Sequence, residues 1–176
     1  MFRIAFLTIC CFICLVAPAA AQVGGSVSVG GSSPARDEQN HLERYRQEML
    51  KDMRIKREET DFKQLLERAQ ENAQLGTELV DQFSHAKSLS PTDVKKLSRM
   101  EKLSRQIRGE TGGSDDKTEL ENSPDELEAA LRRLAELSDE LNKKVEKMTR
   151  HEVSAAVIQQ ANELIALIRH TRSFVQ

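Results

Sequence analysis

The residue types that most often carry out chemistry are few and widely spaced in this chain. The histidines are His41, His85, His151 and His170, and none belongs to an H-E-x-x-H zinc motif. The sequence also contains no glycine-rich phosphate-binding loop and no nucleophile elbow. We therefore predict no catalytic residue, no cofactor-binding residue and no metal ligand, and we expect the protein not to be an enzyme.

One metal-binding alternative remains open at this point. His85 and His151 each fall near a corner that we expect between two helices, and Glu152 follows the second histidine. Imidazole and carboxylate groups can hold zinc or copper if the two corners meet. A lone histidine near a helix end is more commonly a surface residue, so we favour the prediction without a metal.

The N-terminal segment has the pattern of a secretory signal peptide. Arg3 is followed by an apolar run over residues 4–16 and then by Ala19-Ala20-Ala21. A membrane anchor is the alternative, but about 13 apolar residues are fewer than the roughly 20 that a bilayer requires. We expect a signal peptide at residues 1–21 and an exported protein, periplasmic or extracellular. Every cysteine of the chain lies in this segment, at Cys10, Cys11 and Cys14.

The strongest concentration of positive charge lies in residues 91–108. The candidate basic binding face consists of Lys95, Lys96, Arg99, Lys102 and Arg105. A basic face opposite an apolar stripe is typical of helices that bind polyanions or membrane surfaces. Residues 110–126 contain seven acids and one lysine and could screen this face. Binding through this face is therefore our alternative function.

The best-defined helix start is Ser90-Pro91-Thr92-Asp93. Ser90 is expected as N-cap, Pro91 as first helical residue, and Asp93 as the residue that completes a capping box. The following apolar positions recur every three or four residues, as expected for one helical stripe. They are Val94, Leu97, Met100, Leu103 and Ile107. Ser123-Pro124-Asp125-Glu126 repeats the capping signal and predicts a second helix start.

Abundant leucine and alanine, no tryptophan and few β-branched runs predict an all-α fold. Gly76 lies on the apolar stripe of residues 61–87, where it would let a partner helix approach closely. After the signal peptide, we expect the following segments: a flexible Gly/Ser-rich linker at 22–36, an exposed charged helix at 37–60, a first helical hairpin at 61–109, an acidic linker at 110–123, a second helical hairpin at 124–172 and a tail at 173–176.

An internal repeat relates the two hairpins. Placing Ser154 on Ser90 brings Val153 and Ile158 over Leu89 and Val94, which we expect to form a hydrophobic staple. The later pairs include Leu164 over Met100, Leu167 over Leu103, Arg169 over Arg105 and Arg172 over Arg108. One residue of adjustment also aligns the preceding helices, Phe62 with Leu127 and Phe83 with Met148. Duplication and a shared helical period both explain this match, and either predicts two tandem antiparallel hairpins that pack as a bundle, coiled-coil-like, or dimerise.

The pattern SLSPTDVKKLSRMEKLSRQIRG, together with EVSAAVIQQANELIALIRHTRS, resembles a group of small exported helical bacterial proteins of unknown function. The resemblance covers Lys51 to Arg172 and rests on apolar spacing and basic residues. It implies bacterial export, and it carries over no catalytic residue.

We therefore expect an exported non-enzymatic helical protein that acts as an envelope interaction, scaffold or chaperone-like module. The expected partner is an unidentified protein or a second copy of the chain, with no small-molecule substrate and no cofactor. A membrane surface remains an alternative partner. Nucleic acid is not expected, because only Tyr45, Phe62, Phe83 and Phe174 could stack on bases outside the signal segment.

Overall fold

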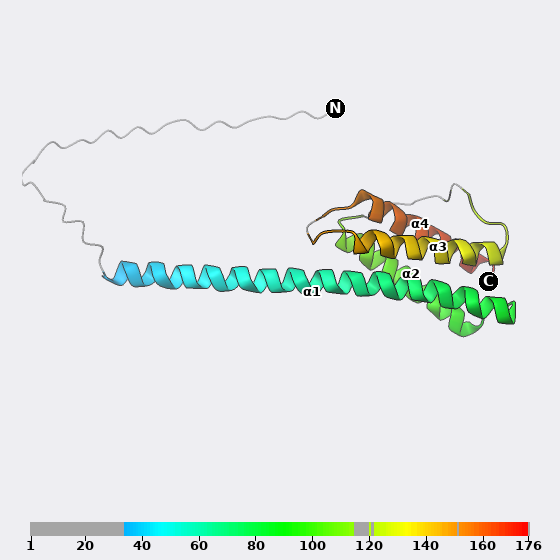
Figure 1. Cartoon of the computed structure of the whole chain (residues 1–176), viewed down its shortest axis with the longest axis horizontal. Coiled ribbons are helices and arrows are strands. Elements are labelled where there is room, and N and C mark those ends of the chain that lie inside the picture. Colours follow the sequence, from blue (N-terminus) through cyan, green and yellow to red (C-terminus); the bar gives the residue numbers. More distant parts are fainter. Residues whose placement is uncertain (1–33, 115–119, 121, 151, 176) are drawn as a thin grey trace, which may run out of the picture. The chain divides into compact units, whose positions relative to one another are not determined.

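The structure is a computed structural model of the whole chain, and it describes residues 34–114, 120, 122–150 and 152–175. These residues contain helices α1 (Pro34–Ala86), α2 (Pro91–Glu110), α3 (Leu127–Glu146) and α4 (Ala155–Ser173), and no strand (Figure 1). The chain divides into two compact units, Met1–Leu42 and Glu43–Gln176, and the second contains the helical bundle. The predicted all-α fold is confirmed. No described helix is both long enough and apolar enough to span a membrane.

Helix α1 packs on both α2 and α3. Asn72 Nδ2 of α1 donates a hydrogen bond of 2.8 Å to Ser104 Oγ of α2. One turn later on the same face, α1 approaches α3 where Gly76 lies beside Ser138 and Ala135. The predicted close approach at Gly76 is therefore confirmed, because a Cβ atom at this position would lie 2.5 Å from Ser138 Oγ and 3.1 Å from Ala135 Cα.

Helix α4 closes the bundle by packing on α2 and α3. It runs antiparallel to α2, because Arg172 of α4 contacts Glu101 whereas Asn162, ten residues earlier, contacts Arg108. Helices α1 and α2 form one hairpin, and α3 and α4 form the other. This is the arrangement of two packed antiparallel hairpins that the apolar stripes predict.

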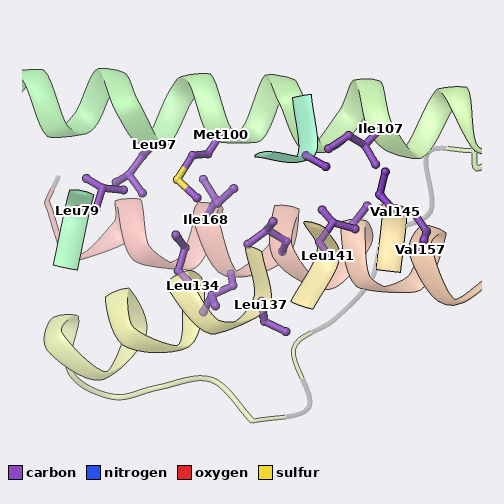
Figure 2. Packing of buried hydrophobic residues seen from close by; sticks show 14 of the residues in the cluster. Leu79, Leu97, Met100, Ile107, Leu134, Leu137, Leu141, Val145, Val157 and Ile168 are labelled. Carbon is purple, nitrogen blue, oxygen red and sulfur yellow. The ribbon is translucent and has the colours of Figure 1, made fainter. Parts of the chain in front are cut away.

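The core lies between the four helices and is almost entirely aliphatic (Figure 2). Each fully buried leucine or isoleucine stabilises the fold by about 1.5–3 kcal/mol through removal of its side chain from water. The predicted stripe of α2 is confirmed at Leu97, Met100, Leu103 and Ile107, all of which are fully buried. Val94 is half-buried.

The two Ser-Pro signals have different outcomes. At α2 the capping box is formed: Asp93 N donates to Ser90 Oγ at 3.2 Å, and Ser90 N donates to Asp93 Oδ2 at 2.9 Å. The predicted start at Ser123 is wrong, since α3 begins at Leu127 without a side-chain cap. The carbonyl of Pro124 lies 2.8 Å from His170 Nε2, so this segment contacts α4 instead of beginning the helix.

The burial pattern of α2 recurs in α4 at a constant shift, the one that places Ser154 on Ser90. The buried residues Leu97, Met100, Leu103, Ser104 and Ile107 correspond to the buried residues Ala161, Leu164, Leu167, Ile168 and Thr171. Ser154 also caps α4 by accepting a hydrogen bond from Val157 N. The second staple is not formed, because Val153 is 73% exposed and lies beside Gly112.

The charged segment expected at residues 37–60 is the N-terminal part of α1, and the helix continues without a break into the bundle. Every side chain from residue 37 to residue 57 is exposed. The expected signal peptide, the Gly/Ser-rich linker up to residue 33 and the acids at positions 115, 116, 119 and 121 lie outside the described residues.

Candidate interaction surfaces

The structure divides the predicted basic face into two parts. Lys96 Nζ lies 3.1 Å from Glu78 of α1, and Arg99 donates two hydrogen bonds of 2.7 Å each to Glu71 of α1. The hydrogen bond from Arg99 lowers the pKa of Glu71, and that from Lys96 lowers the pKa of Glu78. These two cations therefore hold α1 against α2. The acids that neutralise them come from α1.

Arg105 belongs to a separate cluster that joins α2 to α4. Glu101 Oε1 accepts from Arg105 at 2.7 Å and from Arg169 at 3.1 Å, while its Oε2 accepts from Arg172 at 2.7 Å. Burial acts to raise the pKa of Glu101, but hydrogen bonds from Arg169 and Arg105 and the nearby positive charges outweigh it, so the pKa is lowered. The carboxylate thus stays charged between its three arginines.

Lys102 is a neighbour of Arg105 on the exposed surface of α2. It precedes Arg105 by three residues, a spacing that brings two side chains together on a helix surface, whereas its direct neighbour Glu101 points in another direction. Its side chain is exposed, as is that of Lys95, two helical turns earlier. Neither lysine forms an ion pair with another described residue. We call Glu101, Lys102, Arg105, Arg169 and Arg172 the α2–α4 basic cluster.

The other acids on these two helices face different neighbours. Asp93 closes the capping box with Ser90, Glu110 pairs with Arg68 of α1, and Glu163 lies 3.2 Å from Arg133 of α3. Three arginines therefore surround a single carboxylate, and with the exposed Lys102 the cluster has a net charge of +3 in the described part of the chain. Sequence reasoning missed Arg169 and Arg172 as site residues, although the repeat had aligned Arg169 with Arg105.

A second surface is formed by the exposed stripe of α1, which we define as Tyr45, Met49 and Met53. Each of these side chains is at least half exposed, as is that of Leu50 at their margin. Each residue of an α-helix is rotated by about 100° from the one before it. Met49 and the buried Ala69 therefore point in directions that differ by about 200° around the helix axis. The exposed stripe therefore faces roughly away from the side that α1 buries in the bundle.

A cavity of about 490 Å³ lies where α1 enters the bundle. It is lined by Glu58, Asp61, Phe62, Leu65, Glu110 and Arg150. None of these side chains is a ready nucleophile such as serine or cysteine, and within the described ranges no three His, Cys, Asp or Glu residues are grouped as metal ligands. The lining combines two apolar side chains with three carboxylates and one arginine, and it contains no group that we would assign to catalysis.

The described residues do not bring together the two corners between which a metal site was considered. Arg150, at the second corner, donates to Glu59 at 3.0 Å. Glu59 precedes His85 by 26 residues on the same helix, which is about 39 Å at 1.5 Å per residue. The corners therefore lie at opposite ends of the bundle. His151 itself is outside the described residues, and His170 is engaged with Pro124 and, edge to face, with Phe174.

Comparison with known proteins finds no matching family model, no matching curated sequence and no matching solved structure. The α2–α4 basic cluster and the exposed stripe of α1 are therefore the two features of the described residues that indicate a function.

Proposed function

We propose that the chain is an exported, non-enzymatic interaction protein in which the helical bundle is a rigid base and the exposed stripe of α1 contacts a partner protein. The observation that carries this proposal is the stripe itself: three large apolar side chains at helical spacing, all exposed, on a helix whose continuation is buried. An apolar stripe on one helix is the feature that a groove in another protein recognises.

The chemistry of the stripe favours an adaptable contact. Two of its three residues are methionines, whose flexible and polarisable side chains fit irregular apolar surfaces. This property suits a scaffold or a chaperone-like protein that binds more than one client. Export is supported by the charged, apolar and small-residue pattern of residues 1–21.

The charges beside the stripe are nearly balanced and do not select its partner. Residues 42–60 contain six bases and five acids, a net charge of +1, and Arg46 and Arg54 pair with Glu43 and Glu58 on the same helix. The apolar side chains are therefore the part of this surface that a partner protein would recognise.

The test is protection of an unfolding client protein from aggregation during heating, followed by light scattering. We expect the wild-type chain to suppress aggregation at equimolar concentration, and the variant Tyr45→Ser/Met49→Ser/Met53→Ser to lose most of this protection. Ile55→Ser is the matched control, because it removes an apolar side chain from another face of the same helix. Equal protection by the triple variant, or none by the wild type, would contradict the proposal.

The alternative function, polyanion or membrane-surface binding through residues 91–108, loses two of its five residues to α1. Lys96 and Arg99 are paired with Glu78 and Glu71. Of the remaining three, Lys102 and Arg105 lie in the α2–α4 basic cluster, so any anion binding by this helix involves α4 as well.

A further inference from the structure

We propose that the α2–α4 basic cluster is a binding site for a phosphate-type anion, carried either by a soluble phosphate compound or by a phospholipid headgroup. This site lies on a different surface from the exposed stripe, and the inference does not depend on the proposed protein partner. Guanidinium groups bind anions with several charged oxygens, such as phosphate, through paired N–H donors.

The arginines are already oriented by the protein. The Glu101 side chain is only 11% exposed. Its carboxylate accepts one hydrogen bond from each of the three guanidinium groups. Arg172 is fixed further by donating to Ser98. Long side chains that are held in place before a ligand arrives lose less conformational freedom on binding, which favours affinity.

Most of the donor capacity of two arginines remains unused. Arg105 donates to Glu101 through Nη2, and Arg169 donates through Nε. Both side chains are about half exposed, at 46% and 52%. A guanidinium group has five N–H donors, so each of these residues keeps several of them for a second anion on the solvent side of Glu101.

The ratio of charges distinguishes this cluster from the ion pairs on the other side of α2. There, each cation meets its own carboxylate: Arg99 pairs with Glu71, Lys96 with Glu78 and Arg68 with Glu110. Between α2 and α4, three arginines share one carboxylate, and the exposed Lys102 lies next to Arg105 on the helix surface. One arginine would be enough to neutralise Glu101. Each additional exposed ion pair stabilises the fold by at most about 1 kcal/mol. The excess positive charge is therefore the feature that points to a ligand.

The experiment is a titration of the full chain with inorganic phosphate at low ionic strength, followed by amide chemical shifts in two-dimensional NMR. We expect saturable shifts in α2 around Glu101 and in α4 around Arg169. The double variant Arg105→Gln/Arg169→Gln should weaken phosphate binding by roughly tenfold or more, which is the loss expected for a charge-assisted hydrogen bond.

Arg132→Gln/Arg133→Gln on α3 is the matched control, since it removes the same number of charges from exposed ion pairs elsewhere on the bundle. The control should change the dissociation constant less than about twofold. Lys102→Gln provides a second test that leaves the network around Glu101 intact, and it should weaken binding by about two- to fivefold. Thermal unfolding followed by circular dichroism establishes that each variant is folded.

Vesicles distinguish the two sources of the anion. Phosphate binding together with co-sedimentation on phosphatidylglycerol vesicles, lost in Arg105→Gln/Arg169→Gln, assigns a lipid headgroup. Phosphate binding without co-sedimentation assigns a soluble phosphate compound. The proposal is overturned if phosphate produces no saturable shifts, if the control variant loses as much affinity as the cluster variant, or if both cluster variants bind phosphate as the wild type does.

Discussion

Two parts of helix α1 have similar apolar spacing and opposite surroundings. From Phe62 to Phe83, the apolar stripe is packed against α2 and α3, and Leu79 in this part is fully buried. In the exposed stripe, Met53 is 58% exposed. Apolar spacing alone therefore does not determine burial along this helix. The difference lies in whether another helix presents a matching stripe.

The internal repeat explains which part of α1 finds a match. The bundle part of α1 aligns with α3, and its buried positions Leu65, Ala69 and Phe83 correspond to the buried Ala130, Leu134 and Met148. The same shift would place residues 42–60 on residues 107–125, where α2 ends and the connection to α3 follows. The second hairpin thus has no counterpart of the exposed stripe, and the bundle has no helix to cover it.

The largest expected effect comes from truncating a leucine in the bundle part of α1. Leu79→Ala should reduce the free energy of unfolding by about 2–5 kcal/mol, because it leaves a cavity in the core. Met53→Ala in the exposed stripe should change it by less than about 0.5 kcal/mol. Urea unfolding followed by far-UV circular dichroism measures both values. A similar loss for the two variants would show that the stripe is covered in solution, and the comparison between the two parts of α1 would fail.

The next effect concerns the approach of α1 to α3 at Gly76. Gly76→Ala should destabilise the bundle by about 1–3 kcal/mol, since its Cβ atom would overlap Ser138 Oγ and crowd the backbone of Ala135. This loss would exceed the gain of up to about 1 kcal/mol that alanine brings to a helix interior.

Gly109 in α2 provides the control of opposite sign. A Cβ atom there meets nothing within 4 Å, so Gly109→Ala should stabilise the protein by up to about 0.5–1 kcal/mol. The double variant Gly76→Ala/Ser138→Ala should recover part of the loss, because the nearer of the two overlaps is removed. Stabilisation by Gly76→Ala itself would mean that α1 and α3 are further apart than the structure places them.

Local signals in the sequence predicted the fold where the interacting groups are close in the chain. The capping box at Ser90 involves Asp93, only three residues away, and it forms as predicted. The same motif at Ser123 does not start a helix, and the Pro124 carbonyl there contacts His170, 46 residues later. A contact over such a distance depends on how the hairpins pack, which the motif does not encode.

The candidate site was predictable only in part for the same reason. Charge density identified Lys102 and Arg105 on α2, since both belong to one basic run. It could not show that Lys96 faces Glu78 of α1, or that Arg169 reaches Glu101. The partners of a charged residue across helices follow from the rotation and register of each helix in the bundle. The alignment of Arg169 with Arg105 was the available signal, and it became informative only once α2 and α4 were known to be neighbours.

The smallest expected effect compares a carboxylate of the bundle with one on the N-terminal part of α1. Glu101 has a lowered pKa in the folded protein, so the unfolded chain binds a proton more readily than the folded one near the ordinary value of 4.5. Its contribution to stability is therefore present above that value and is lost as the pH falls through the lowered pKa. Glu101→Gln should cost about 1 kcal/mol at neutral pH and progressively less in acid.

Glu43→Gln is the matched change, because Glu43 forms an exposed pair with Arg46 at 2.9 Å on α1. This variant should keep the wild-type stability at both neutral and acidic pH, since the pair is fully accessible to water and salt. Urea unfolding of the three proteins over a series of pH values gives the comparison. The free energies of unfolding of the wild type and of Glu101→Gln could differ by the same amount from neutral pH down to about pH 3. That result would show that the arginines do not hold Glu101 as a charged group. In that case the three guanidinium groups would not be oriented for a second anion, and the phosphate site would lose its organising residue.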